Sequence, residues 1–335
     1  MSGSPPDRSA RGAPLLRAVA PAAGEPDPRE DPESILRRIE WTVIRRLDGL
    51  LQGDYRTLFR AFGLDLADLR EYQFHDDVRH IDWNVTARLQ IPHVREFNAD
   101  REVTAWFLLD LSGSVDFGSR RVRKRMLSAE LTAVLGRLLT RHGNRVGAIL
   151  YSDRVDAVIP ARGGRRHVLH LIDRVLRPGE RRRGKETDLA ELMEKAQSAI
   201  KRRSVLFVVS DFISRPGWNR GLALLARRHE IVAVRLYDPL EMELPDLGLI
   251  VMQDAETGEQ LFVDTHDAGF RRRFVEAAGR REAALRSALA EAGVDCLELA
   301  TDDDLVEALM RFTVLRKRRS QIAAGVTVPK HRLEP

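Results

Sequence analysis

Residues 103–114 read VTAWFLLDLSGS, an apolar run that ends in an acid and continues into small residues with hydroxyl groups. Trp106–Leu109 is apolar at every position, which predicts a strand that is buried on both faces of a parallel sheet. A second run of this kind, Val205–Val209, ends in Ser210 and Asp211. Both runs are therefore predicted to be central strands of one sheet.

From residue 103 onward the chain alternates predicted strands and helices, which is typical of α/β folds. The predicted strands are 103–109, 145–151, 155–160, 205–209, 231–236 and 294–299. The predicted helices are 121–141, 168–176, 188–202, 219–228, 268–292 and 302–312. The second and third strands are expected to pair as a hairpin, and residues 247–263 are expected to form a hairpin-like insert. The prediction is a mostly parallel, Rossmann-like sheet with helices on both faces.

Composition divides the chain into four predicted parts. Residues 1–32 contain seven of the fifteen prolines, so we expect a disordered tail. Residues 33–100 are predicted to hold an amphipathic helix followed by a charge-dense segment. Residues 101–315 are assigned to the α/β domain, and residues 316–335 to a basic C-terminal tail.

Composition also excludes several classes of protein. With 335 residues, 43% of them hydrophobic and 31% charged, the chain can bury its own core and is not of a disordered or membrane-spanning class. Its single cysteine, Cys296, rules out an intramolecular disulfide framework and a cysteine-rich zinc site. No apolar stretch approaches the roughly 20 residues of a membrane helix, and the start of the chain has no apolar signal segment. We expect a cytoplasmic protein.

Side chains with oxygen atoms stand at the predicted carboxyl ends of the central strands, where ligands bind in open α/β sheets. Asp110, Ser112, Ser114 and Asp211 follow these strands, and Thr187, which opens a helix directly after the basic loop, is expected to converge with them. Oxygen donors without sulfur or imidazole suit a hard cation, so the sequence predicts a site for Mg²⁺ (or Mn²⁺). Two carboxylates leave the ion short of negative charge, and a carboxylate from a partner would complete its shell.

Four of these residues also have a purely local interpretation. Thr187 could cap the helix that follows it, and Asp211 could cap the turn after its strand. Ser112 and Ser114 could close a local turn. Because all of them fall at strand ends, the sequence favours one shared site over separate local roles.

The spacing Asp110-x-Ser112-x-Ser114, with Thr187 and Asp211 downstream, resembles the metal-ion-dependent adhesion site of von Willebrand factor A domains. The resemblance implies that Asp110, Ser112 and Ser114 ligate the ion directly or nearly so. It implies that Thr187 and Asp211 ligate directly or through water. In that family the site binds a partner and does not catalyse a reaction, so we do not expect an enzyme.

The segment before the sheet carries a second resemblance. Residues 69–88, LREYQFHDDVRHIDWNVTAR, followed by VREF at 94–97, are similar to the signature of the DUF58 family, with His75 where glycine is usual. The family resemblance implies genomic association with MoxR-type AAA+ ATPases, in chaperone-like or cofactor-insertion assemblies. The charges of this segment could fasten it to the sheet domain through ion pairs, or they could form a recognition surface for the ATPase. A metal site made of His75, His80 and Asp82 is not favoured, because no spacing places them on one face.

The basic stretch Arg162–Lys185, with nine basic and two acidic residues and a net charge of +7, raises other functions. It is not a P-loop, because Glu186 stands where Ser or Thr must follow Lys185. Nucleic-acid binding is not favoured either, since no aromatic residues are interleaved for base stacking. A hydrolase is not favoured, because no Gly-x-Ser-x-Gly elbow occurs and Cys296 lies on a predicted buried strand. The alternative function is a scaffold that binds partners or nucleic acid through basic loops, with a vestigial metal site.

Overall fold

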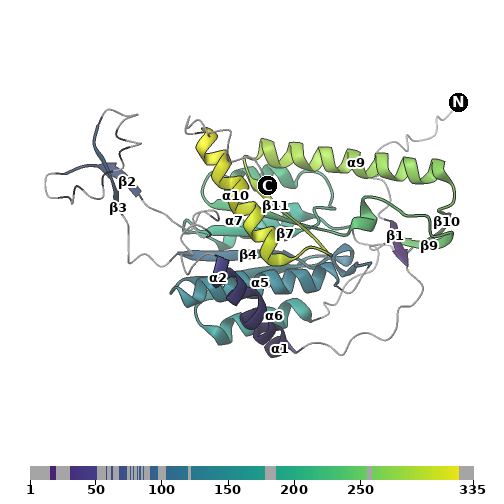
Figure 1. The fold of residues 1–335 in the computed structure, drawn as a ribbon, viewed down its shortest axis with the longest axis horizontal. Coiled ribbons are helices and arrows are strands. Elements are labelled where there is room, and N and C mark those ends of the chain that lie inside the picture. Colours follow the sequence, from purple (N-terminus) through teal and green to yellow (C-terminus); the bar gives the residue numbers. More distant parts are fainter. Residues whose placement is uncertain are drawn as a thin grey trace, which may run out of the picture.

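The computed structural model describes residues 16–19, 31–50, 58, 62, 68–73, 76, 78, 81, 83, 86, 91–96, 103–119, 122–177, 186–254 and 259–323. Its main body is a central sheet with helices layered on both sides (Figure 1). The predicted mixed α/β fold with a mostly parallel sheet is confirmed.

The central sheet has six strands in the order β11-β8-β7-β4-β5-β6. In chain order they are β4 (Thr104–Asp110), β5 (Arg145–Tyr151), β6 (Val155–Arg162), β7 (Val205–Ser210), β8 (Glu230–Tyr237) and β11 (Asp295–Ala300). Neighbours are parallel except β5 and β6, which pair antiparallel as the predicted hairpin. The two apolar runs are therefore adjacent central strands, β4 and β7, and their carboxyl ends meet at one edge of the sheet.

Helices cover both faces of this sheet, which explains why the central strands are apolar throughout. On one face lie α5 (Lys124–Arg141), α6 (Arg165–Leu176) and α10 (Leu305–Ala323); on the other lie α7 (Leu189–Ala199), α8 (Trp218–Ala226) and α9 (Ala268–Glu291). Successive side chains of a strand point to opposite faces. Accordingly, Phe107 and Leu109 pack in the first layer, and Leu108 packs in the second.

The helix predicted from Pro32 forms in three consecutive pieces, α1 (Pro32–Ile39), the π-helical η1 (Glu40–Ile44) and α2 (Arg45–Leu50). Its apolar stripe packs into the core beside α5 and α6. Ion pairs add to this contact: Glu33 meets Arg165 at 2.7 Å, and Glu40 meets Arg137 at 2.6 Å. The N-terminal helix is thus part of the α/β body.

Smaller elements lie around the body. A three-stranded antiparallel sheet is made of β1 (Leu16–Val19), β9 (Leu249–Asp254) and β10 (Gln260–Asp264), and the β9–β10 pair is the predicted hairpin insert. A separate two-stranded sheet is made of β2 (Asp68–Glu71) and β3 (His93–Glu96), and it lies apart from the body in Figure 1. Two short 3-10 helices are η3 (Gly113–Asp116) and η4 (Pro239–Glu241).

Several predictions fall partly or wholly outside the described residues. They include the rest of the proline-rich tail before Asp31, the loop at 178–185, and His75, His80 and Asp82. At the other end of the chain, α10 continues past Phe312 as far as Ala323. No helix in the described part of the chain combines the length and the apolar character needed to cross a bilayer.

Candidate metal centre

Asp110 ends β4 with its side chain fully buried and both carboxylate oxygens fixed. Its Oδ1 accepts a hydrogen bond from the Ser112 backbone N–H at 2.9 Å, and its Oδ2 accepts one from the Ser210 hydroxyl at 2.6 Å. Past Asp110 the chain turns into η3, which brings the Ser112 and Ser114 hydroxyl oxygens within 3.2 Å of each other. The Asp-x-Ser-x-Ser motif therefore folds into one buried group of oxygen atoms.

Arg125, on the first turn of α5, holds this loop in place. Its buried guanidinium donates to the backbone carbonyls of Leu111 at 2.9 Å and Val175 at 3.1 Å, and it forms an ion pair with Asp116. A guanidinium with several fixed acceptors restricts the backbone on either side of the motif. The loop is thereby anchored to α5 and to the end of α6.

The end of β7 supplies Asp211, which is buried beside the β4 loop. Its Oδ1 accepts the backbone N–H of Ile213 at 3.0 Å. The next residue, Phe212, has a φ of 57°, which lies in the left-handed region that non-glycine residues rarely adopt. Burial of its ring against Trp218, with 5.1 Å between the ring centroids, holds this conformation. Backbone strain of this kind clusters at functional sites.

Asp110 is a buried carboxylate with a second buried carboxylate, Asp211, beside it. A cation close to Asp110 would stabilise its ionised form. Burial, and secondarily the neighbouring carboxylate of Asp211, raise the pKa of Asp110 from 3.8 to about 6. A divalent ion held by Asp110 would offset the effect of burial and favour the ionised form of this carboxyl group. The donor set is one of oxygens alone, so the residues present fit Mg²⁺ or Mn²⁺.

The raised pKa of Asp110 predicts how the metal-free protein responds to pH. Because the folded pKa, about 6, lies above the unfolded value of 3.8, this group stabilises the fold most below pH 3.8, and that contribution is lost as pH rises through 6. The loss amounts to about 3 kcal/mol in the free energy of unfolding. Urea unfolding in chelator between pH 4 and 7.5 measures it. Asp110→Asn should remove this component of the pH dependence, and an unchanged profile in that variant would refute the assignment.

Thr187 lies at the same edge of the sheet, where α7 begins. Its backbone carbonyl accepts hydrogen bonds from the Arg215 N–H at 3.0 Å and the Ser214 hydroxyl at 3.1 Å, in the loop after β7. The adjacent Asp188 N–H donates to the Tyr151 hydroxyl at 3.1 Å, and Tyr151 pairs with Asp110 in the β4–β5 register. Direct hydrogen bonds thus join Asp110, Ser112 and Ser114 to one another, whereas backbone contacts position Thr187.

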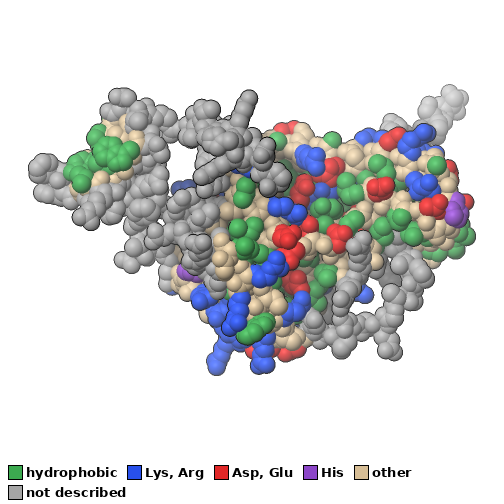
Figure 2. Space-filling view, viewed as in Figure 1, with side chains coloured by type: hydrophobic (Ala, Val, Ile, Leu, Met, Phe, Trp, Pro, Cys, Tyr) green, Lys and Arg blue, Asp and Glu red, His purple; other side chains and the backbone are tan. Residues whose placement is uncertain are grey.

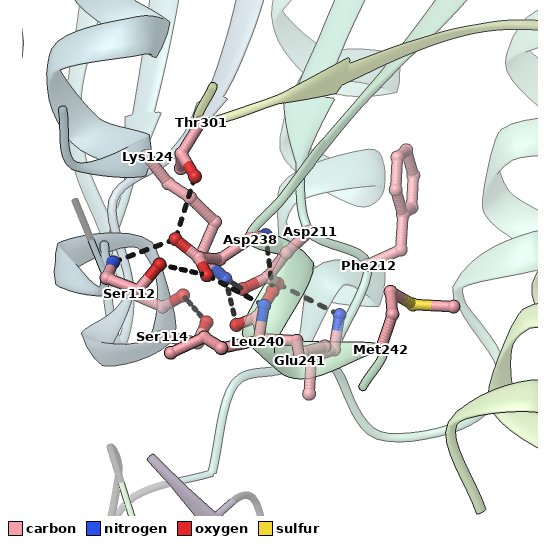
Figure 3. Close-up of polar contacts among 12 residues, drawn as sticks. Ser112, Ser114, Lys124, Asp211, Phe212, Asp238, Leu240, Glu241, Met242 and Thr301 are labelled. Carbon is pink, nitrogen blue, oxygen red and sulfur yellow. Dashed lines mark hydrogen bonds and ion pairs between the residues drawn. The ribbon is translucent and has the colours of Figure 1, made fainter. Parts of the chain in front are cut away.

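Sequence reasoning missed three charged residues at this edge, namely Lys124, Asp238 and Glu241. Lys124 is completely buried, and its Nζ lies 2.7 Å from Asp211 Oδ2 and 2.7 Å from Glu241 Oε1 (Figure 3). Burial alone would lower the pKa of Lys124, but the two carboxylates outweigh it and raise that pKa. The ammonium therefore stays charged. In the sequence, Lys124 is distinguished only by its position in a run of basic residues, and such runs are typical of a charged surface.

Glu241 is held in turn by the end of β8. Its Oε2 accepts the Asp238 backbone N–H at 3.0 Å, and Asp238 caps η4 by accepting the Leu240 N–H at 3.0 Å. The Asp238 carboxylate also accepts hydrogen bonds from the hydroxyls of Ser119 and Thr301, each at 2.7 Å, and Figure 3 shows the contact with Thr301. Burial works against ionisation of Asp238, but these hydrogen bonds outweigh it and lower its pKa. Lys124, Glu241 and Asp238 thus form a connected set of polar groups next to Asp211, at the end of β8.

Among the described residues, no three His, Cys, Asp or Glu side chains are arranged to hold a metal ion. An ion at the end of β4 would therefore depend on hydroxyl ligands as well as carboxylates. Ser112, Ser114 and Thr187 supply hydroxyl groups at this edge, and all three are buried.

Comparison with known proteins gives relatives in mycobacteria. An uncharacterized protein of Mycobacterium tuberculosis strain H37Rv is 36% identical over 291 residues, which cover 86% of this chain and 92% of that protein. An uncharacterized protein of Mycobacterium bovis matches to the same extent. One from Mycobacterium avium is 34% identical over 160 residues, covering 48% of this chain and 94% of that protein.

Two solved structures match part of this chain at low identity. An aerotolerance-related membrane protein from Bacteroides fragilis matches with a TM-score of 0.42 and 11% identity, covering 64% of this chain and 99% of that one. The conserved hypothetical protein BatB from Bacteroides thetaiotaomicron matches with a TM-score of 0.38 and 12% identity, covering 66% and 98%.

A protein-family model also matches the chain. The DUF58 family, described as proteins of unknown function, matches residues 68–284, more than half of the chain. The match includes β4 and β7 and the loops that carry Asp110 and Asp211. Together with the mycobacterial relatives, it shows that this chain belongs to the DUF58 family.

Proposed function

We propose that this protein is a non-catalytic, metal-dependent protein-binding module of the von Willebrand A type. In this proposal Mg²⁺ (or Mn²⁺) binds at Asp110, Ser112, Ser114, Thr187 and Asp211, and a carboxylate of a partner protein completes its shell. The observation that carries the proposal is the buried group at the end of β4, where Asp110 is fixed by two hydrogen bonds beside the Ser112–Ser114 hydroxyl pair.

The chemistry of these residues supports binding over catalysis. When bound, the ion would supply a positive centre that attracts an acidic side chain. Asp110 would hold the ion, while the neutral hydroxyls of Ser112 and Ser114 would orient it without cancelling its charge. Cys296, the one thiol of the chain, has its pKa raised to about 12 by burial, so it is not activated as a nucleophile.

The proposed partner is a MoxR-type AAA+ ATPase or its client, in a chaperone-like assembly in the cytoplasm. Membership in the DUF58 family supports this partner, because the family resemblance implies association with such ATPases. The proposal places an acidic residue of that partner at the end of β4.

A second candidate is a scaffold that binds through the basic stretch Arg162–Lys185, with a vestigial metal site. Part of the positive charge of this stretch is already neutralised, because Arg165 pairs with Glu33 and Arg177 with Asp173. On the face shown in Figure 2, acidic and basic side chains lie side by side across the middle of the described surface, whereas basic side chains gather at its lower end. These pairings favour the metal-dependent module over the scaffold.

A capture experiment separates the two candidates. The full chain is immobilised and exposed to the purified MoxR-type ATPase of its own organism, in Mg²⁺ or in excess chelator, at low and at moderate salt. We expect retention in Mg²⁺ and loss of at least about tenfold in chelator, since loss of the ion removes a direct contact. If retention of the ATPase is unchanged by chelator but falls steeply as the salt concentration rises, the proposal is overturned and the scaffold is favoured.

A further inference from the structure

Lys124 is a fully buried ammonium at the proposed metal site, and neither the family resemblance nor the proposed function gives it a role. It is the first residue of α5, and its side chain extends between the ends of β7 and β8 (Figure 3). There it contacts one oxygen each of Asp211 and Glu241, both at 2.7 Å. A buried charge is costly unless it is paired, so this arrangement needs both partners.

The contact changes what Asp211 can do. Its Oδ2 faces the Lys124 ammonium and its Oδ1 accepts the Ile213 N–H, so both oxygens are already engaged. An ammonium at hydrogen-bond distance repels a second cation that approaches the same carboxylate. Direct coordination by Asp211 would require Lys124 to leave, but Glu241 holds Lys124, and the cap of η4 holds Glu241.

We infer that Lys124 is a positioning residue that withholds Asp211 from direct contact with the metal ion. Asp110 is then the one carboxylate that the chain offers directly, and the ion keeps a larger share of its charge for the partner's carboxylate. Asp211 stays paired with Lys124 and interacts with the ion only electrostatically, without direct coordination. This inference rests on the proposed function, and it adds the feature that makes the ion receptive to an acidic ligand.

Two double variants test the inference at constant charge. Asp110, Asp211, Glu241 and Lys124 together carry a formal charge of −2. Lys124→Met with Glu241→Gln keeps that charge and frees Asp211, whereas Lys124→Met with Asp211→Asn keeps it and removes the Asp211 carboxylate. Because the formal charge is the same, a difference in metal affinity between them reports which carboxylate, Asp211 or Glu241, is left without Lys124.

Calorimetric titration with Mg²⁺ is the measurement. In Lys124→Met/Glu241→Gln we expect binding about tenfold tighter than in the wild type, because a second carboxylate can reach the ion. In Lys124→Met/Asp211→Asn we expect no such gain, because this variant lacks the carboxylate that the loss of Lys124 would free. Loss of structure would weaken binding, so it cannot mimic the expected gain.

Two results would overturn the inference. One is a folded Lys124→Met/Glu241→Gln variant, judged by circular dichroism, that binds Mg²⁺ no more tightly than the wild type. The other is a loss of more than about tenfold in Lys124→Met/Asp211→Asn, which would make Asp211 a direct ligand despite Lys124. If Lys124→Met/Glu241→Gln does not fold, the comparison of Lys124→Met/Asp211→Asn with the wild type still tests the inference. Absence of Mg²⁺ uptake in the wild type and in both variants would instead overturn the proposed function itself.

Discussion

Asp110→Ala should lower the affinity of the protein for Mg²⁺ by at least about 100-fold, more than the loss expected for an outer-shell residue. Asp110 is the buried carboxylate around which the site is built, with hydrogen bonds from Ser112 and Ser210. Without it, the remaining direct donors are neutral hydroxyls, which bind a divalent cation weakly. Calorimetric titration of Mg²⁺ into the wild type and the variant measures the difference.

The fold should survive this substitution. Removing Asp110 leaves two hydrogen-bond donors unpaired, but it also removes a carboxyl group whose pKa is raised by burial and secondarily by Asp211. Asp267→Ala is a matched control, since it removes an exposed Asp that caps α9 far from this loop in sequence. We expect the control to bind Mg²⁺ like the wild type. Equal affinity in Asp110→Ala and in the control would show that the ion binds elsewhere or not at all.

Phe207→Ala should destabilise the protein by about 3–5 kcal/mol, the range for deleting a buried aromatic ring. Phe207 lies on β7 with no exposed surface. Its ring packs against Phe107 on β4 and against Phe62, with centroids 5.3 Å and 5.4 Å away. The cavity would open beneath the strand that carries Asp211. Urea denaturation, followed by far-ultraviolet circular dichroism, measures the change in the free energy of unfolding.

Val158→Ala on β6 serves as the control for this prediction. Its side chain is 37% exposed, so its removal should cost less than about 1 kcal/mol. A cost below about 1 kcal/mol for Phe207→Ala as well would mean that the β4–β7 core is not packed as described.

Much of the fold could be predicted from the sequence because its signals are local. Apolar runs at 106–109 and 205–209 predicted central strands, and both are buried on two faces. The hairpin of β5 and β6 and the insert of β9 and β10 follow from turn residues between short apolar segments. The end of α10 was less predictable, because Arg316 reads as part of a basic tail. In the fold it pairs with Glu230 and Asp295, which keeps the helix attached to the sheet.

At the candidate site, Asp110, Ser112, Ser114 and Asp211 could be selected from the sequence because they directly follow predicted strands. Lys124 could not be found in this way, because nothing local distinguishes a buried lysine from a solvated one within a basic run. Its partners are 87 and 117 residues away, so its role exists only after the strands have assembled. The left-handed backbone of Phe212 is hidden for the same reason, since tertiary packing imposes it.

The most direct test of the account is to locate Mn²⁺ in crystals of the full chain by its anomalous scattering. The account predicts one peak at the carboxyl end of β4, about 2 Å from oxygens of Asp110, Ser112 and Ser114. In the same crystals, the ion pair between Lys124 and Asp211 should be intact next to the Mn²⁺ peak. Crystals saturated with Mn²⁺ that show no peak at this edge of the sheet, or show it bound elsewhere, would contradict the account.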